Sequence, residues 1–196
     1  MKKLLFFLVF VALSVGAFAQ YSQSRPTHQF MMKLEFGYLP FVTNVGDATS
    51  EPNINNQAHY PLDRMEHAVG FNLMLGSNFS QDFFLGAGLG YAYCAPIKEF
   101  ASGRHSALFF ADLDYRPLAE KFAPMLGVRL GGSFLTSDDF HESSLSPYLE
   151  VYAGLNIYTN HVISNMERNN KSFFVELGAA YMQRTVFLPI RFGWRW

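Results

Sequence analysis

Apolar and polar residues alternate one by one through much of this chain, most clearly in its last segment, 186–196. The apolar positions there are Leu188, Ile190, Phe192, Trp194 and Trp196. The positions between them hold Arg191, Gly193 and Arg195. A period of two residues predicts a β-strand with one apolar and one polar face. The chain ends on an aromatic residue of the apolar face.

Seven earlier segments repeat this pattern. Together with the last segment they make eight predicted strands, an even number. The expected strands are 30–38, 67–77, 83–93, 107–116, 126–134, 148–157 and 173–182. We therefore predict an all-β fold, an eight-stranded antiparallel up-and-down transmembrane β-barrel, in a single domain covering residues 28–196.

The segments between the strands are polar and rich in Asn, Pro, Asp or Gly, which indicates loops and turns. The expected connections are 40–66, 78–82, 95–103, 117–121, 136–146, 159–171 and 183–185. In a membrane barrel, long external loops alternate with short periplasmic turns. The first connections follow this alternation, whereas 159–171 and the short last connection depart from it.

The first residues have the features of a secretory signal peptide. A basic head, Met1-Lys2-Lys3, precedes an apolar run from Leu4 to about Val15 and the small-x-small motif Ala17-Phe18-Ala19. We predict a signal peptide over 1–19, cut before Gln20, and a polar lead-in over 20–27. The apolar run is too short to span a membrane as a helix. If the mature chain enters a membrane, it must therefore do so as strands.

The polar face of the predicted strands combines glycine with a balanced set of charges. Glycine weakens a solvent-exposed strand, but inside a narrow barrel it leaves room for long side chains. We therefore predict that this face lines the lumen and carries an ion-pair network. Its members would be Lys33, Glu35, Asp112, Asp114, Arg129, Glu150, Glu176, Arg191 and Arg195. As a more specific hypothesis, Glu35, Asp112 and Glu150 pair with Arg129, Arg191 and Arg195.

The other face carries aromatic residues near the strand ends, as the interfacial girdles of membrane barrels do. These are Tyr38, Tyr91, Tyr93, Tyr115, Tyr181, Trp194 and Trp196. Only 16% of the residues are charged, against about 25% in typical soluble domains. With 15 basic and 16 acidic residues, the chain has no basic excess that would indicate nucleic-acid binding. Alternation is also compatible with a soluble secreted barrel, in which the apolar face would enclose a core.

With its closing strand and with segments such as Phe110–Pro117 and Pro124–Gly131, the chain resembles the small eight-stranded outer-membrane barrels of the OmpA and OmpX type. The resemblance implies export through the inner membrane and residence in the cell outer membrane. It implies contacts with outer-membrane lipid and lipopolysaccharide. It also implies recognition by the barrel-assembly machinery through Phe192, Trp194 and Trp196, although the family terminus is most often Phe.

Such barrels serve as scaffolds, adhesins, small pores or lipid-modifying enzymes, so the fold alone does not determine function. Eight strands leave an interior that side chains can fill. We expect a structural or surface-interaction scaffold, with a narrow small-solute transport barrel as the alternative.

A lipid-modifying enzyme using His105 and Ser106 is disfavoured, because adjacent residues of a strand point to opposite faces. No cofactor or metal motif is present in the sequence. The long loop offers His59, Tyr60 and Arg64 as candidate contacts for a surface partner, whose identity the sequence leaves open.

Overall fold

The computed structural model describes residues 30–45, 65–79, 82–96, 103–116, 122–136, 144–159 and 171–196. The predicted signal peptide, the lead-in and the loop residues His59, Tyr60 and Arg64 lie outside the described residues and stay predictions. Across the described ranges, no helix is long and apolar enough to cross a membrane.

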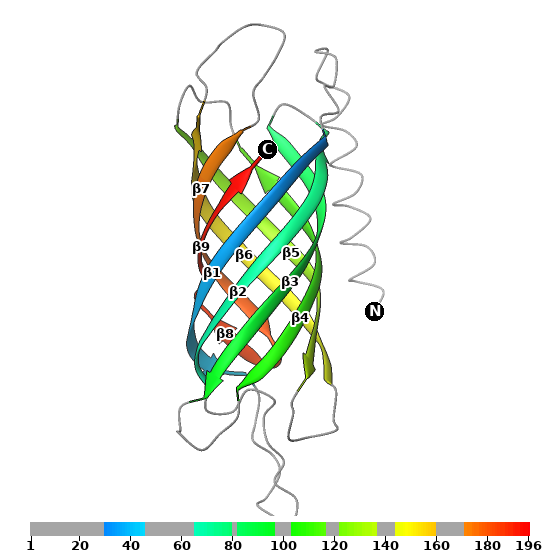
Figure 1. Ribbon diagram of the computed structural model, residues 1–196, viewed down its shortest axis with the longest axis vertical. Helices are drawn as coiled ribbons and strands as arrows, with labels where there is room; N and C mark the ends of the chain where they lie inside the picture. The colour runs from blue at the N-terminus through cyan, green and yellow to red at the C-terminus, as the bar shows by residue number, and fades with distance from the viewer. Residues whose placement is uncertain are drawn as a thin grey trace, which may run out of the picture.

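The structure is a closed antiparallel barrel in which neighbouring strands of the chain are neighbours in space (Figure 1). The strands are β1 (Phe30–Asn44), β2 (Met65–Asn78), β3 (Phe83–Pro96), β4 (Arg104–Tyr115), β5 (Phe122–Thr136), β6 (Ser144–Tyr158), β7 (Ser172–Met182), β8 (Thr185–Phe187) and β9 (Ile190–Arg195). β8 and β9 both pair with β7 and with β1, so together they form the eighth strand and close the barrel. The prediction of an eight-stranded up-and-down antiparallel barrel is confirmed.

The strands are strongly staggered around the barrel. When paired residues are followed from strand to strand around the barrel, the series starts at Met31 on β1. It returns to β1 at Phe41, ten positions further along the strand. It passes through Gly76, Gly86, Asp112, Arg129, Glu150, Ala180 and Phe187. Such a stagger corresponds to strands tilted by about 35–45°. Figure 1 shows the strands inclined to the long axis of the barrel. It also makes Asp112, Arg129 and Glu150 immediate neighbours on the inner face.

The apolar face of every strand points outward and the polar face points into the barrel. Leu89 on β3 and Phe192 on β9 are 68% and 60% exposed, whereas Lys33 and Arg129 are 0% exposed. In the described strands the inner wall holds charged, polar, aromatic and glycine residues together with some Met, Leu and Ala, and the outer wall is dominated by Leu, Val, Ala, Phe and Tyr. The sheet therefore has the orientation of a membrane barrel rather than that of a soluble barrel around an apolar core.

The strands are longer than the alternating pattern indicated, and several predicted boundaries were wrong. For example, β5 begins at Phe122 rather than 126, and β6 begins at Ser144, inside the loop expected over 136–146. The loop expected from Pro40 begins later, because β1 continues to Asn44 and the carbonyl oxygen of Pro40 accepts a hydrogen bond from the Leu188 amide. The last strand is interrupted at Leu188 and Pro189, since proline has no amide hydrogen for the ladder. Backbone pairing thus continues to the rims, where the alternation of side chains fades.

A tight turn at Gln183 and Arg184 joins β7 to β8. Both residues have positive φ angles, 52° and 60°, which fits a two-residue hairpin turn with mirror-image geometry. The Gln183 side chain points into the barrel, where its amide nitrogen donates to the backbone oxygen and the hydroxyl of Ser133 at 2.9 and 3.0 Å. These hydrogen bonds tie the hairpin to β5.

Candidate functional site in the barrel lumen

Side chains fill the lumen in layers along the barrel axis. Toward the β7–β8 turn lies an apolar cluster of buried residues. Its members are Leu39, Ala68, Met74, Ala92, Cys94, Leu108, Phe110, Leu135, Tyr148, Ala180, Met182 and Phe187. A smaller cluster of Met125, Tyr152 and Phe174 lies toward the end where β1 begins and β9 ends. Most of the charged residues lie in a layer between these two clusters.

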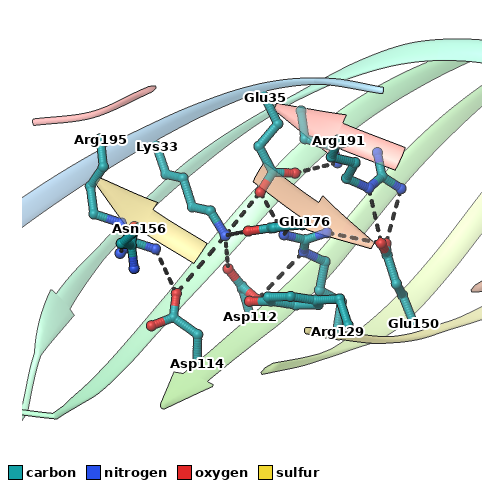
Figure 2. A network of polar contacts seen from close by, with 12 residues as sticks. Lys33, Glu35, Asp112, Asp114, Arg129, Glu150, Asn156, Glu176, Arg191 and Arg195 are labelled. Carbon is teal, nitrogen blue, oxygen red and sulfur yellow. Dashed lines mark hydrogen bonds and ion pairs between the residues drawn. The ribbon is translucent and has the colours of Figure 1, made fainter. Parts of the chain in front are cut away.

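Four side chains of alternating charge form the centre of this layer (Figure 2). The Lys33 ammonium lies 2.9 Å from Glu35 and 2.7 Å from Glu176. Arg129 Nη2 contacts the same two carboxylates at 2.5 and 2.7 Å. We call Lys33, Glu35, Arg129 and Glu176 the central square. The square joins strands β1, β5 and β7 across the lumen, so it connects parts of the wall that are not hydrogen-bonded to each other.

Arg129 is also the link from the square to a second set of ion pairs. It lies directly between Asp112 on β4 and Glu150 on β6 in the sheet register, with ion-pair distances of 3.4 and 3.1 Å. Glu150 in turn accepts two hydrogen bonds of 2.9 Å from Arg191 Nε and Nη2. The Tyr148 hydroxyl contacts Glu150 and accepts a hydrogen bond from Arg191 Nη2. Such two-point contacts are among the stronger ion pairs in proteins.

A third group lies toward the end of the barrel where β1 begins. Arg195 Nη2 donates to Asp114 Oδ2 at 2.7 Å, and Arg116 Nε donates to Asp114 Oδ1 at 2.8 Å. Lys33 lies 3.9 Å from the same carboxylate and connects this group to the central square. Arg116 was missing from the predicted network, although it occupies an inward position of the same alternating segment as Asp112 and Asp114. Continuing the alternation of this strand by one more inward position, from Asp114 to Arg116, would have included it.

Neutral polar and aromatic side chains satisfy much of the remaining hydrogen-bonding capacity. Tyr152 donates to Asp112 at 2.7 Å, and its ring lies 4.2 Å from the Arg129 guanidinium carbon. Asn72 donates to Glu35 at 3.0 Å. The Lys33 ammonium lies 4.8 Å from the centre of the Phe174 ring. Burying a charge costs several kcal/mol unless partners surround it, and these side chains supply many of those partners.

Inner-face glycines make the space that these long side chains occupy. A Cβ atom added at Gly37 would lie 2.9 Å from Arg191 Nη1. One added at Gly88 would lie 2.6 Å from atoms of Met74 and Phe110. The glycines on the inner face therefore leave the space that the larger lumenal side chains occupy.

The predicted network residues all lie inside the barrel, and their pairing differs in part from the hypothesis. Glu35, Asp112 and Glu150 contact Arg129, and Glu150 also contacts Arg191. Arg195 instead pairs with Asp114. With Arg116 included, the described lumen holds five basic side chains (Lys33, Arg116, Arg129, Arg191 and Arg195) and five acidic ones (Glu35, Asp112, Asp114, Glu150 and Glu176). These formal charges balance.

His105 and Ser106, the pair weighed for a lipid-modifying enzyme, lie on opposite faces of β4. His105 lies on the outer face, where its Nδ1 contacts the Tyr91 hydroxyl. Ser106 lies inside and is 0% exposed. Across the described strands, no group of three or more His, Cys, Asp or Glu side chains could hold a metal ion.

The C-terminal aromatic residues lie on the outer face at the seam that closes the barrel. Phe192 stacks on Phe36 with ring centres 6.0 Å apart, and Trp194 meets the Phe173 ring edge-on. The backbone of Trp196 exchanges two hydrogen bonds with Met32. The last strand is thus paired to its final residue.

Comparisons with known proteins find similarity in structure alone. No family model matches the sequence, and no curated protein matches it. Neisserial surface protein A (NspA) superposes with a TM-score of 0.58 and 14% identity, over 85% of this chain and 95% of that chain. The chain has the fold of a small outer-membrane barrel. The N-terminal β-barrel domain of Pseudomonas aeruginosa OprF (TM-score 0.49, 14% identity, 86% of this chain and 98% of that one) is also similar. So is Ail of Yersinia pestis (TM-score 0.40, 16% identity, 86% and 99%).

Proposed function

We propose that the protein is an integral outer-membrane barrel that acts as a closed scaffold for its connecting loops. The observation that carries this proposal is the combination of an apolar outer wall with a lumen filled by ion pairs. In hydrocarbon, unpaired backbone groups are too costly to be exposed. A closed barrel with an apolar exterior meets this requirement, whereas the same exterior in water would expose a large apolar surface.

The length of the strands supports a membrane-spanning role. β1 to β7 contain between 11 and 15 residues each. At about 3.3 Å per residue and a tilt near 45°, even the shorter strands reach roughly the 25 Å height of the apolar band of outer-membrane barrels. Tyr115 and Trp194 lie on the outer wall near strand ends, where aromatic residues contact the membrane interface. Tyr38 lies in the middle of β1 instead.

The packing of the lumen supports a scaffold rather than a transport pathway. The charged layer lies between two apolar clusters, and Arg129, Lys33 and Glu35 in that layer are completely buried. An ion crossing the barrel would have to separate these pairs and then pass the larger apolar cluster. The positions of His105 and Ser106 on opposite faces support a barrel without catalytic function.

A scaffold in the outer membrane implies three kinds of partner for this protein. Its outer wall would contact outer-membrane lipid and lipopolysaccharide, and Phe192, Trp194 and Trp196 would be read by the barrel-assembly machinery during biogenesis. The connection containing His59, Tyr60 and Arg64 is our candidate for binding a surface partner, since rigid scaffolds commonly present functional loops.

Two measurements test this function. We expect the protein in the outer-membrane fraction, with an electrophoretic mobility that changes on boiling, because a folded barrel migrates differently from its unfolded chain. We also expect purified protein to give no ion conductance in planar bilayers. Recovery in a soluble fraction without a mobility shift would contradict the membrane proposal, and steady conductance would favour the narrow transport barrel.

A further inference from the structure

The polar group around Arg195, at the end of the lumen where β9 ends, contains more hydrogen-bond donors than acceptors. Arg195 and Arg116 bind the two oxygens of one carboxylate, Asp114, one oxygen each. Asn156 Oδ1 accepts from Arg195 Nη1 at 3.4 Å and from the Ser172 hydroxyl at 3.3 Å. The acceptors that Arg195 contacts are therefore already shared with other donors.

Two donor atoms in this group have no protein acceptor among the described residues. They are Arg195 Nε and Asn156 Nδ2, and both side chains are 0% exposed. Figure 2 shows the two side chains next to each other beside Asp114. Arg129 Nε and Nη1 also lack a hydrogen bond, but they lie 3.4 and 3.1 Å from carboxylates. Buried polar groups are nearly always satisfied, and exceptions call for a water molecule or an ion.

We propose that Arg195 and Asn156 bind a small inorganic anion of the size of chloride inside the lumen. A water molecule could accept hydrogen bonds from both atoms, but it would bring two hydrogens of its own. Asn156 Oδ1 already accepts two hydrogen bonds and each Asp114 oxygen already accepts one, so a water molecule would add donors to a group that is already rich in them. An anion brings no hydrogen, and it would offset a local excess of positive charge, because two guanidinium groups share a single carboxylate here although the charges of the described lumen balance as a whole.

The size of the ligand follows from the surroundings of Arg195. Its guanidinium carbon lies 5.6 Å from the centres of both the Phe84 and the Phe174 rings. A Cβ atom at Gly193 would meet the Phe174 ring, so the wall is closely packed beside the site. In such close packing, sulfate, phosphate or an organic anion would need the aromatic rings to move, so the anion that we propose is monatomic.

The first test uses the wild-type protein in detergent. The midpoint of thermal unfolding is measured in sodium chloride and in sodium gluconate at equal ionic strength, which keeps general screening constant. An anion that binds only the folded barrel raises the midpoint by a similar step for each tenfold increase in chloride above its Kd. Crystals grown with bromide should show an anomalous peak within contact distance of Arg195 Nε and Asn156 Nδ2.

Two variants localise the effect. Asn156→Asp places a carboxylate beside Arg195, so the chloride dependence should disappear and stability in gluconate should rise. Ser106→Ala changes another buried lumenal side chain, on β4 and outside this group, and should keep the chloride dependence. Equal stability of the wild type in both salts, a bromide-free site, or unchanged chloride dependence in Asn156→Asp would overturn the proposal. Should Asn156→Asp fail to fold, the two wild-type measurements decide.

Discussion

Glu35 on β1 and Glu176 on β7 bind the same two cations, Lys33 and Arg129, from opposite sides of the central square. Neither strand is a neighbour of β5, which carries Arg129. We therefore expect the square to act as a cross-brace that holds the barrel wall at a fixed diameter, because no backbone hydrogen bonds join these strands. The following predictions test the parts of this lumen.

Removing Arg129 should destabilise the folded barrel more than any other single change in the network. Arg129→Met would leave Glu35, Glu176, Asp112 and Glu150 sharing fewer cations in a buried layer. Breaking a buried ion pair from one side costs about 3–5 kcal/mol. We expect a lower midpoint for loss of the heat-modifiable folded band. Arg184→Met, the same change at an exposed turn residue, should leave the midpoint unchanged. An unchanged midpoint for Arg129→Met would show that the network does not brace the barrel.

Glu150 and Arg191 should be strongly coupled energetically. Their two-point contact predicts that Glu150→Gln and Arg191→Met are each destabilising, and that the double variant is less destabilised than the sum of the two. A double-mutant cycle from urea unfolding in detergent should give a coupling energy of about 0.5–3 kcal/mol. Additive effects would mean that the contact contributes no pairwise energy.

Inner-face glycine is required where the lumen is tightly filled. Gly88→Leu would collide with Met74 and Phe110, its direct neighbours on β2 and β4. We expect loss of most of the folded band, since overpacking a close-packed interior costs about 1–3 kcal/mol or more. Ala87→Leu places the same side chain one residue away on the exposed outer wall, and it should fold normally. Equal folding of both variants would mean that the lumen has spare room beside β3.

The hairpin between β7 and β8 should become more stable when Arg184 is replaced by glycine. Arg184 has a φ of 60° and an exposed side chain, and a left-handed conformation costs a non-glycine residue roughly 1–2 kcal/mol. Arg184→Gly should therefore raise the unfolding midpoint. Gln183→Gly removes the hydrogen bonds to Ser133 as well, so its effect should be unfavourable or close to zero. A destabilised Arg184→Gly would indicate an interaction of the arginine side chain that outweighs the relief of backbone strain.

The sequence by itself determined the number of strands and the face that each residue occupies. Both follow from a strict period of two, which assigns Lys33, Asp112 and Arg129 to one face without any knowledge of the partners of each strand. It also indicated that this face is the inner one. In a narrow lumen, glycine leaves space for long side chains and opposite charges can pair, whereas glycine only weakens a strand that faces water.

The tertiary structure decided which charges meet, and where the strands end. Pairing across the lumen depends on stagger and barrel diameter, which bring Glu35 to Arg129 and Arg195 to Asp114. Two charged residues on the same face can be neighbours or can lie on opposite sides of the barrel, and local alternation does not distinguish these cases. Strand ends were hidden for a related reason. Backbone hydrogen bonds continue to Asn44 and resume after the break at Pro189. The side-chain pattern, in contrast, shows only the part of each strand that has an apolar outer face and a polar inner face.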